Sequence, residues 1–236
     1  MKTKRYFSMK KSGFLLKGML VGLVLTAFAV SCTNLDEDLY DTITPEDFFN
    51  SEESYVSALG SAYTTLTNYA SGDPLSVHET STDEMVVPTR GQDWDDGGHW
   101  RRLHLHSWTY EETYFNGAWN FGFEGVNKAN QLIYQFETLV EDGMVEEATA
   151  AAFIAELRAI RGFFYWQLID LFGNVPLVLD FATAEAAPAN VDRAQVWTTI
   201  VADLEEAVPL LNTTVGGTSY GRMNYYAGKP CWPSCT

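Results

Sequence analysis

Cysteine is scarce in this chain of 236 residues. It occurs three times, at Cys32, Cys231 and Cys235, so residues 33–230 contain none. A disulfide framework is therefore excluded for the body of the protein. With 46% hydrophobic residues, the chain can instead bury an apolar core in one domain. The last two cysteines form a C-x-x-x-C pattern, but a metal or redox site is disfavoured there because no histidine or third cysteine lies nearby.

Basic residues are also in short supply. The chain has 15 Lys and Arg against 31 Asp and Glu, a formal net charge of −16. Six of the basic residues lie within the first 31 positions, which hold no acidic residue, so the remainder is more acidic still. Nucleic acid is therefore excluded as a partner, because binding to a phosphate backbone needs a basic surface. An acidic surface favours neutral or cationic ligands over anionic ones.

Catalytic and cofactor motifs are missing as well. The chain has no phosphate-cradling glycine loop and no Gly-x-Ser-x-Gly elbow, and we expect no cofactor. The acid pairs Asp83–Glu84, Asp95–Asp96 and Glu111–Glu112 could supply glycosidase carboxylates, but adjacent acids usually point apart. His104 and His106 could bind a metal from one strand face, yet a third ligand at a convincing spacing is missing, which favours a surface or packing role. The sequence therefore predicts a protein that is not an enzyme.

The N-terminus has the pattern of an export signal. A basic segment precedes an apolar run of 13 residues from Gly18 to Val30, too short for the ~20 residues of a spanning helix. Residues 1–31 are therefore predicted to be a cleaved signal peptide rather than a permanent anchor helix. Cys32 follows small residues as in the lipobox of bacterial lipoproteins, although Ala29 stands where leucine is usual. We expect Cys32 to carry lipid and residues 32–43 to form an acidic tether.

The body of the chain has the periodicity of helices. Thr44–Asp47 supplies a cap and an N-terminal proline for a helix to about Tyr69, and apolar residues recur at helical spacing over 123–140 and 152–169. A capping-box-like start at Asp192 and an Asn at position 224 open two more helices. Residues 75–113 show no persistent period and are predicted to be a long loop. The fold class is therefore all-α, with tetratricopeptide-like hairpins and an insert at 174–191 that loops out.

Six short segments stand out by their order along the chain, namely Ser81–Glu84, Arg90–Trp94, Gly97–Trp100, Val126–Asn130, Leu157–Trp166 and Leu171–Leu177. Together they resemble the SusD/RagB family of nutrient-uptake outer-membrane lipoproteins. The resemblance covers residues 32–229 and implies an N-terminal helical domain over 44–229, followed in the family by a C-terminal half that this chain lacks. The implied protein is a surface receptor anchored in the outer membrane by lipid, facing outward. It would capture oligosaccharide, or peptide in some members, and deliver it to a TonB-dependent SusC-like porin.

An aromatic segment offers the best candidate for the binding surface of such a receptor. Residues 86–118 mix aromatic rings with charged residues, and sugars stack on flat rings while their hydroxyl groups bond to polar side chains. We select Trp94 and Trp100 as ligand-binding residues, because the neighbouring glycines allow a ligand to approach closely, together with the charged Arg90 and Asp93. The alternative is that these rings only pack the loop onto the helices.

The last seven residues, 230–236, do not fit the preceding pattern. Two prolines and two cysteines interrupt the helix that opens at Asn224. Family members typically continue after Ala-Gly-Lys with Ala-Leu-Leu-Ala-Lys-Leu-Tyr, and deletion of one base from suitable codons for that segment yields this tail. We hypothesise a frameshift, which resequencing of the gene would refute if the frame is undisturbed. A non-functional truncated copy, a glycosidase-associated fragment and a structural lipoprotein remain as alternatives.

Overall fold

The regular elements in the described part of the chain are almost all helices. The computed structural model describes residues 48–70 and 72–229, so the predicted signal peptide, Cys32 and the tail lie outside the described residues. In chain order, with η for short 3-10 helices, the elements are α3 (Glu52–Thr64), α4 (Asp73–Thr80), η1 (Asp96–Gly98), α5 (His99–His104), α6 (Thr113–Glu141), α7 (Glu147–Leu171), β1 (Val175–Pro176), β2 (Asn190–Val191), α8 (Arg193–Ala207), η2 (Val208–Leu210), η3 (Gly217–Ser219) and α9 (Tyr225–Gly228). The predicted all-α class is confirmed.

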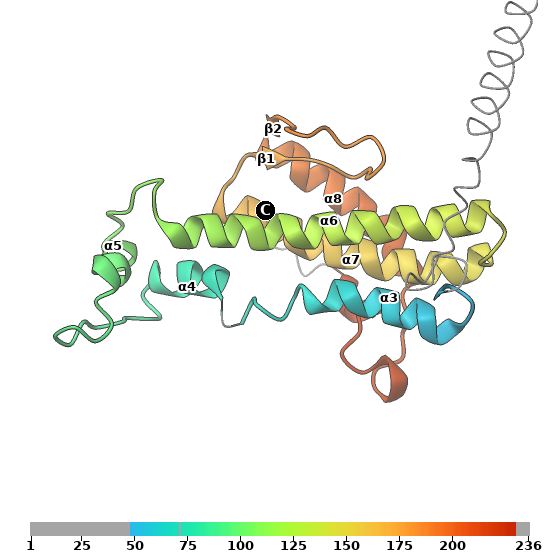
Figure 1. The fold of residues 1–236 in the computed structure, drawn as a ribbon, viewed down its shortest axis with the longest axis horizontal. Helices are drawn as coiled ribbons and strands as arrows, with labels where there is room; N and C mark the ends of the chain where they lie inside the picture. The colour runs from blue at the N-terminus through green and yellow to red at the C-terminus, as the bar shows by residue number, and fades with distance from the viewer. Residues whose placement is uncertain (1–47, 71, 230–236) are drawn as a thin grey trace, which may run out of the picture. The chain divides into compact units, whose positions relative to one another are not determined.

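The helices α6 and α7 form the predicted antiparallel hairpin and run side by side along their length (Figure 1). The turn between them uses Gly143 at a left-handed φ of 70°, a conformation that costs glycine little. The amides of Met144 and Val145 donate to the carbonyl oxygen of Leu139 and complete the end of α6. The hairpin is therefore closed by backbone bonds of the kind that a glycine after a helix provides.

Helix α7 is the centre of the core, because α3, α6 and α8 all pack on it. Its side chains are buried on most of its circumference, including Leu157, Ile160, Phe164 and Leu168. The predicted apolar face of α7 was wrong in part, because Ala152 is exposed. A helix that is covered by neighbours on several sides buries more than one face, so a prediction of one apolar face describes it only in part.

Two glycines let α6 approach α7 closely. A Cβ atom at Gly125 would lie 2.2 Å from carbon atoms of the Phe164 ring, and one at Gly122 would lie 2.5 Å from the Leu168 side chain. The large side chains of α7 occupy the space that these glycines leave. Glycine weakens a helix interior by roughly 0.5–1 kcal/mol, and here the tight packing against α7 offsets that cost.

The predicted loop over 75–113 contains two helices and is corrected. Helix α4 begins at Asp73, with Pro74 in the first turn where a proline needs no amide donor. The buried residues Val77 and Thr80 hold α4 in place, and α4 packs on α6. Helix α5 has only six residues. Elements this short depend on tertiary contacts, which periodicity does not reveal.

Helix α3 is shorter than predicted. It is capped by Ser51 and Ser54, whose side chains bond reciprocally to each other's backbone amides, and it ends at Thr64. Its predicted start at Thr44 and Pro45 lies outside the described residues. Its side chains Leu59 and Ala62 are buried in the core.

The insert between α7 and α8 is anchored at its ends, and its middle, residues 180–187, is exposed. The short strands β1 and β2 pair antiparallel, with Val175 opposite Val191. The hydroxyl group of Tyr165 accepts from the amide of Val178 at 2.7 Å and donates to its carbonyl oxygen at 3.0 Å. Asn130 of α6 also donates to that carbonyl oxygen, at 2.8 Å. These bonds hold the first part of the insert against α6 and α7.

The second hairpin begins as predicted but with different caps. The Asp192 side chain makes no capping bond; instead Asn174 Oδ1 accepts from the Arg193 amide at 3.0 Å. Asn224 does cap α9, accepting from the amides of Tyr226 and Ala227.

None of the helices within the described residues combines the length and the hydrophobicity that crossing a membrane requires.

Candidate ligand-binding site

The aromatic segment is built around a buried carboxylate at the start of α6. Glu112 precedes α6 and is 7% exposed. Its carboxylate accepts from His99 Nδ1 at 2.9 Å and from Arg102 through Nη2 at 3.0 Å and through Nε. His99 and Arg102 lie three residues apart on α5 and so reach Glu112 together. This ion-paired group fixes α5 to the N-terminal end of α6.

Aromatic rings pack beside this ion-paired group. The His99 ring stacks on Tyr114 with centroids 3.7 Å apart and an interplanar angle of 12°. Trp100 meets Tyr114 edge-on at 5.3 Å, and its Nε1 donates to Asp96 at 2.5 Å. Trp100 is only 8% exposed. Its ring therefore supports the surface from below rather than forming it.

Trp94 forms the exposed part of the same cluster. Its ring is 50% exposed and meets Trp100 edge-on, with centroids 6.1 Å apart. Its backbone has a left-handed φ of 57°, which is uncommon for a residue with a large side chain. Such outliers persist where the surroundings enforce them and are frequent at binding sites. The half-exposed indole ring is the kind of flat surface on which a ligand can stack.

Arg90 and Asp93 sit at the base of a tight turn that leads to Trp94. The amide of each donates to the carbonyl oxygen of the other, at 2.9 and 3.0 Å. Gly91 lies between them with a φ of 67°, which favours glycine. Both side chains are exposed. The structure thus brings Arg90, Asp93 and Trp94 into one loop and packs Trp94 on Trp100.

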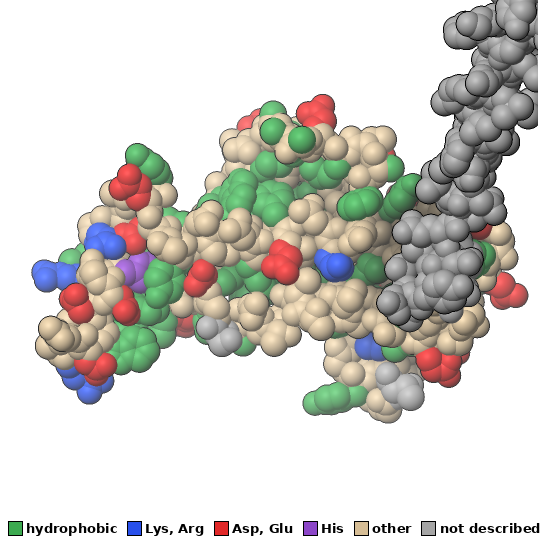
Figure 2. All heavy atoms as spheres, viewed as in Figure 1, with side chains coloured by type: hydrophobic (Ala, Val, Ile, Leu, Met, Phe, Trp, Pro, Cys, Tyr) green, Lys and Arg blue, Asp and Glu red, His purple; other side chains and the backbone are tan. Residues whose placement is uncertain are grey.

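Further exposed rings follow along the chain after α5. Tyr110 is 92% exposed and Trp108 is 39% exposed, with its ring against His106 and Phe115. Figure 2 shows the α5 end of the domain as a mixture of hydrophobic, basic and acidic side chains. His106 Nε2 lies 2.6 Å from the carbonyl oxygen of Ser81, so this histidine has a packing role. Within the described residues, no group of three or more His, Cys, Asp or Glu could hold a metal ion.

Electrostatics reinforce the structure under Trp94. The Arg102 guanidinium, helped by His99, lowers the pKa of the Glu112 carboxyl to about 2. Burial raises the pKa of the Tyr114 hydroxyl and that of the Asp73 carboxyl, which packs against Gly117 of α6. Glu112 is thus held ionised as the permanent partner of two α5 side chains.

Sequence reasoning identified the rings but missed their supports. The sequence indicated Glu112 only as one of the two acids in Glu111–Glu112, and His99 only as a member of the segment Gly97–Trp100. The His99–Arg102 spacing indicates one helix face once a helix is assumed over 99–104. The partner Glu112 could not be inferred, because it depends on a chain reversal between α5 and α6.

The helical hairpins carry exposed aromatic rings at one end, and comparison with known proteins places the chain in a family. Residues 34–228 match the model of a SusD-like family described as starch-binding and associating with the outer membrane. The chain therefore belongs to the SusD-like family.

Similar proteins agree with this assignment. SusD-like protein P2 of Formosa agariphila is 25% identical over 198 residues, which cover 81% of this chain and 37% of that protein. A laminarin-binding SusD-like protein has a similar structure, with a TM-score of 0.64 and 22% identity over 76% of this chain and 38% of that one. Surface glycan-binding protein A from Bacteroides fluxus has a TM-score of 0.62 and 22% identity, over 75% of this chain and 38% of that one. This chain therefore spans well under half of the length of these proteins.

Proposed function

We propose that this protein binds neutral oligosaccharides at the outer membrane, with the Trp94 ring as the stacking surface. The observation that carries the proposal is a half-exposed indole ring held edge-on by the buried Trp100. Sugar rings present flat C–H faces that suit such a surface, and the exposed Arg90 and Asp93 side chains offer polar groups beside it. The acidic charge of the chain favours a neutral ligand over an anionic one.

The family supports the same class of ligand. Its description names starch, and the similar proteins are described as binding laminarin or as surface glycan-binding proteins. The finer proposal is that lipid on Cys32 anchors the protein to the outer membrane, facing the exterior. There it would deliver oligosaccharide to a TonB-dependent SusC-like porin for nutrient uptake.

We further propose binding without catalysis. A glycosidase needs a general acid whose pKa is raised, together with a second carboxylate across the scissile bond. Glu112 is the buried carboxylate of this region, and its pKa is lowered to about 2 by Arg102. Asp96 accepts a hydrogen bond from Trp100. Glu112 and Asp96 therefore serve to hold the aromatic cluster, while Asp73, whose pKa burial raises, packs against Gly117 of α6.

The experiment is a comparison of Trp94→Ala with Tyr220→Ala in the full chain. Tyr220 is 85% exposed and lies in the loop before α9, so it is a matched loss of an exposed ring. Calorimetry with laminarin oligosaccharides and with maltooligosaccharides should show at least about tenfold weaker binding for Trp94→Ala, a loss of about 1.4 kcal/mol, and an unchanged affinity for Tyr220→Ala. Equal affinities for both variants would refute the role of Trp94.

The same samples test the alternatives. Binding of a peptide mixture instead of sugars would favour a RagB-like peptide receptor, and release of reducing sugar would favour a glycosidase-associated fragment. A chain that shows no cooperative unfolding and binds nothing would be a non-functional truncated copy.

A further inference from the structure

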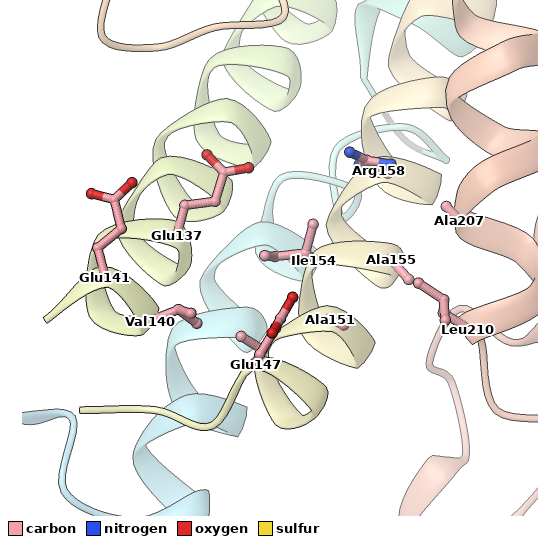
Figure 3. Close-up of a pocket in the computed structure, with 11 residues that line it drawn as sticks. Glu137, Val140, Glu141, Glu147, Ala151, Ile154, Ala155, Arg158, Ala207 and Leu210 are labelled. Atoms are coloured by element: carbon pink, nitrogen blue, oxygen red, sulfur yellow. The ribbon is translucent and has the colours of Figure 1, made fainter. Parts of the chain in front are cut away.

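A second candidate binding surface lies at the opposite end of the α6–α7 hairpin from Trp94. A groove of about 370 Å³ opens there between the last turns of α6 and the end of α8, with the first turns of α7 as its floor (Figure 3). Helix α6 has 29 residues, which at 1.5 Å per residue separate its two ends by roughly 40 Å. The groove is therefore distinct from the aromatic site, and the inference does not rest on the proposed glycan function.

The floor of the groove is apolar. Val140 and Ile154 line it from α6 and α7, and Leu210 of η2 closes the side next to α8. Leu210 is 54% exposed, so it offers apolar surface that the fold leaves uncovered. Small residues between them, Ala151, Ala155 and Ala207, keep the groove open. An apolar floor of this kind suits the apolar face of a helix.

Carboxylates line the α6 side. Glu137 and Glu141 lie one turn apart on α6 and are exposed, and Glu147 rises from the first turn of α7 (Figure 3). Within the described residues, no Lys, Arg or His makes an ion pair with these three carboxylates. The basic residue of the lining, Arg158, is engaged with Asp203 at 3.3 Å and with Glu206 at 3.2 Å. The groove is thus an apolar floor beside a net negative rim.

The placement of Glu137 and Glu141 costs local stability. Like charges four residues apart on a helix repel by roughly 0.2–0.5 kcal/mol. The C-terminal end of α6 carries the negative end of the helix dipole, which disfavours carboxylates there, and its last turn holds no basic residue. Residues that destabilise their own helix often belong to functional sites.

We propose that this groove binds an amphipathic helix of another protein, with its apolar face on Ile154 and Leu210 and with lysine or arginine side chains toward Glu137 and Glu141. Cations spaced three or four residues apart on that helix would match the one-turn spacing of the two carboxylates. Charge complementarity of this kind steers association and fixes the register of the partner.

The test uses the full chain and a labelled synthetic peptide of about 16 residues, long enough to form a helix on binding. Leucines recur along one face of the peptide, and lysines flank them four residues apart. Fluorescence anisotropy should detect binding of this peptide and not of a counterpart with glutamate in place of each lysine. Absence of binding by the lysine peptide, or equal binding of the two peptides, would overturn the proposal.

Matched variants separate the groove from the general negative charge of the chain. Glu137→Gln with Glu141→Gln should weaken peptide binding about five- to tenfold, the sum of two exposed ion pairs. The control, Glu124→Gln with Glu185→Gln, removes two exposed carboxylates that lie outside the groove lining and should change binding less than about twofold. Equal weakening by both pairs would show non-specific attraction and overturn the proposal.

Two further readouts guard against a folding defect. The thermal midpoint of the Glu137→Gln, Glu141→Gln variant should be unchanged or higher, because a repulsive pair is removed. Ile154→Ser keeps every charge and should also weaken peptide binding. If Ile154→Ser folds and binds the peptide as the unaltered chain does, the apolar floor takes no part and the proposal is wrong.

Discussion

The Nδ1 atom of His99 lies 2.9 Å from a carboxylate oxygen of Glu112 and joins α5 to the start of α6. Glu112 also accepts from Arg102, so one buried carboxylate binds two side chains of a six-residue helix. A helix of six residues has little intrinsic stability in water. The position of α5, and with it the position of Trp100 under Trp94, therefore depends on Glu112.

Glu112→Gln should release α5 from α6. Glutamine keeps the shape of the side chain but loses the charge-assisted bonds to Arg102 and His99, which costs roughly 1–3 kcal/mol. We expect a lower free energy of unfolding by chemical denaturation and faster hydrogen exchange of the α5 amides. Glu111→Gln, its exposed neighbour, is the matched control and should leave both unchanged. If α5 exchanges no faster in Glu112→Gln, the proposed role of the carboxylate is wrong.

The same residue predicts an acid dependence of stability. The pKa of Glu112 is lowered from 4.5 to about 2 in the folded chain, and the hydrogen bond from Arg102 is the largest cause. Its contribution is therefore complete above about pH 4.5 and is lost as the pH falls toward 2. Denaturant unfolding across that range should show a smaller loss of stability for Glu112→Gln than for the unaltered chain. Parallel curves for the two proteins would contradict the assignment.

The helices that the sequence predicts correctly are those with long apolar periods. Helix α6 has 29 residues and buries one broad face. Its apolar residues therefore recur at helical spacing, as at Ile133, Phe136 and Leu139. Helix α4 has eight residues and packs on α6, whereas α5 has six and meets α6 through the stack of His99 on Tyr114. No local pattern encodes these contacts. The contact of Trp94 with Trp100 follows from their nearness in sequence, whereas the bond from His99 to Glu112 needs the chain to reverse.

Gly125→Ala should destabilise the α6–α7 hairpin. The added methyl group would lie 2.2 Å from the Phe164 ring, so the ring or the helix must move. Overpacking of this kind costs about 1–3 kcal/mol, which exceeds the roughly 0.5–1 kcal/mol that alanine gains over glycine in a helix. Gly60→Ala in α3 is the control, because nothing lies within 4 Å of its added methyl group and it should gain stability. Thermal midpoints that move in the same direction would refute this packing argument.

The buried ion pair between Arg161 and Asp203 should be costly to break from one side. Arg161 Nη2 lies 2.5 Å from Asp203, and Nη1 donates to Asn130 at 2.7 Å and to the carbonyl oxygen of Leu179 at 3.1 Å. Arg161→Met leaves the largely buried carboxylate of Asp203 with Arg158 as its remaining cation. We expect the free energy of unfolding to fall by up to about 3–5 kcal/mol.

Adding Asp203→Leu to Arg161→Met should recover much of that loss, because an apolar pair can replace a buried ion pair at little cost. Chemical denaturation of the two single variants and the double variant measures the coupling. Losses that simply add would show that the two side chains do not act as a pair in the folded chain.

The segment before α9 is held by Tyr63 of α3. The Tyr63 hydroxyl donates to Glu156 at 2.8 Å and accepts from the Met223 amide at 2.5 Å, while Arg222 Nε pairs with Glu156 at 3.1 Å. Burial is the main reason that the pKa of Tyr63 is raised, and the protonated hydroxyl group donates to Glu156. The bond between Tyr63 and Met223 connects residues that are 160 positions apart in the sequence.

Tyr63→Phe should loosen this segment without disturbing the core. Phenylalanine keeps the ring but leaves the Met223 amide without its acceptor and Glu156 with one donor fewer, which costs roughly 1–3 kcal/mol. Hydrogen exchange at Met223 and its neighbours should quicken, while the amides of α7 stay protected. Tyr220→Phe removes an exposed hydroxyl and should alter neither. Unchanged exchange at Met223 in Tyr63→Phe would mean that other contacts hold the segment.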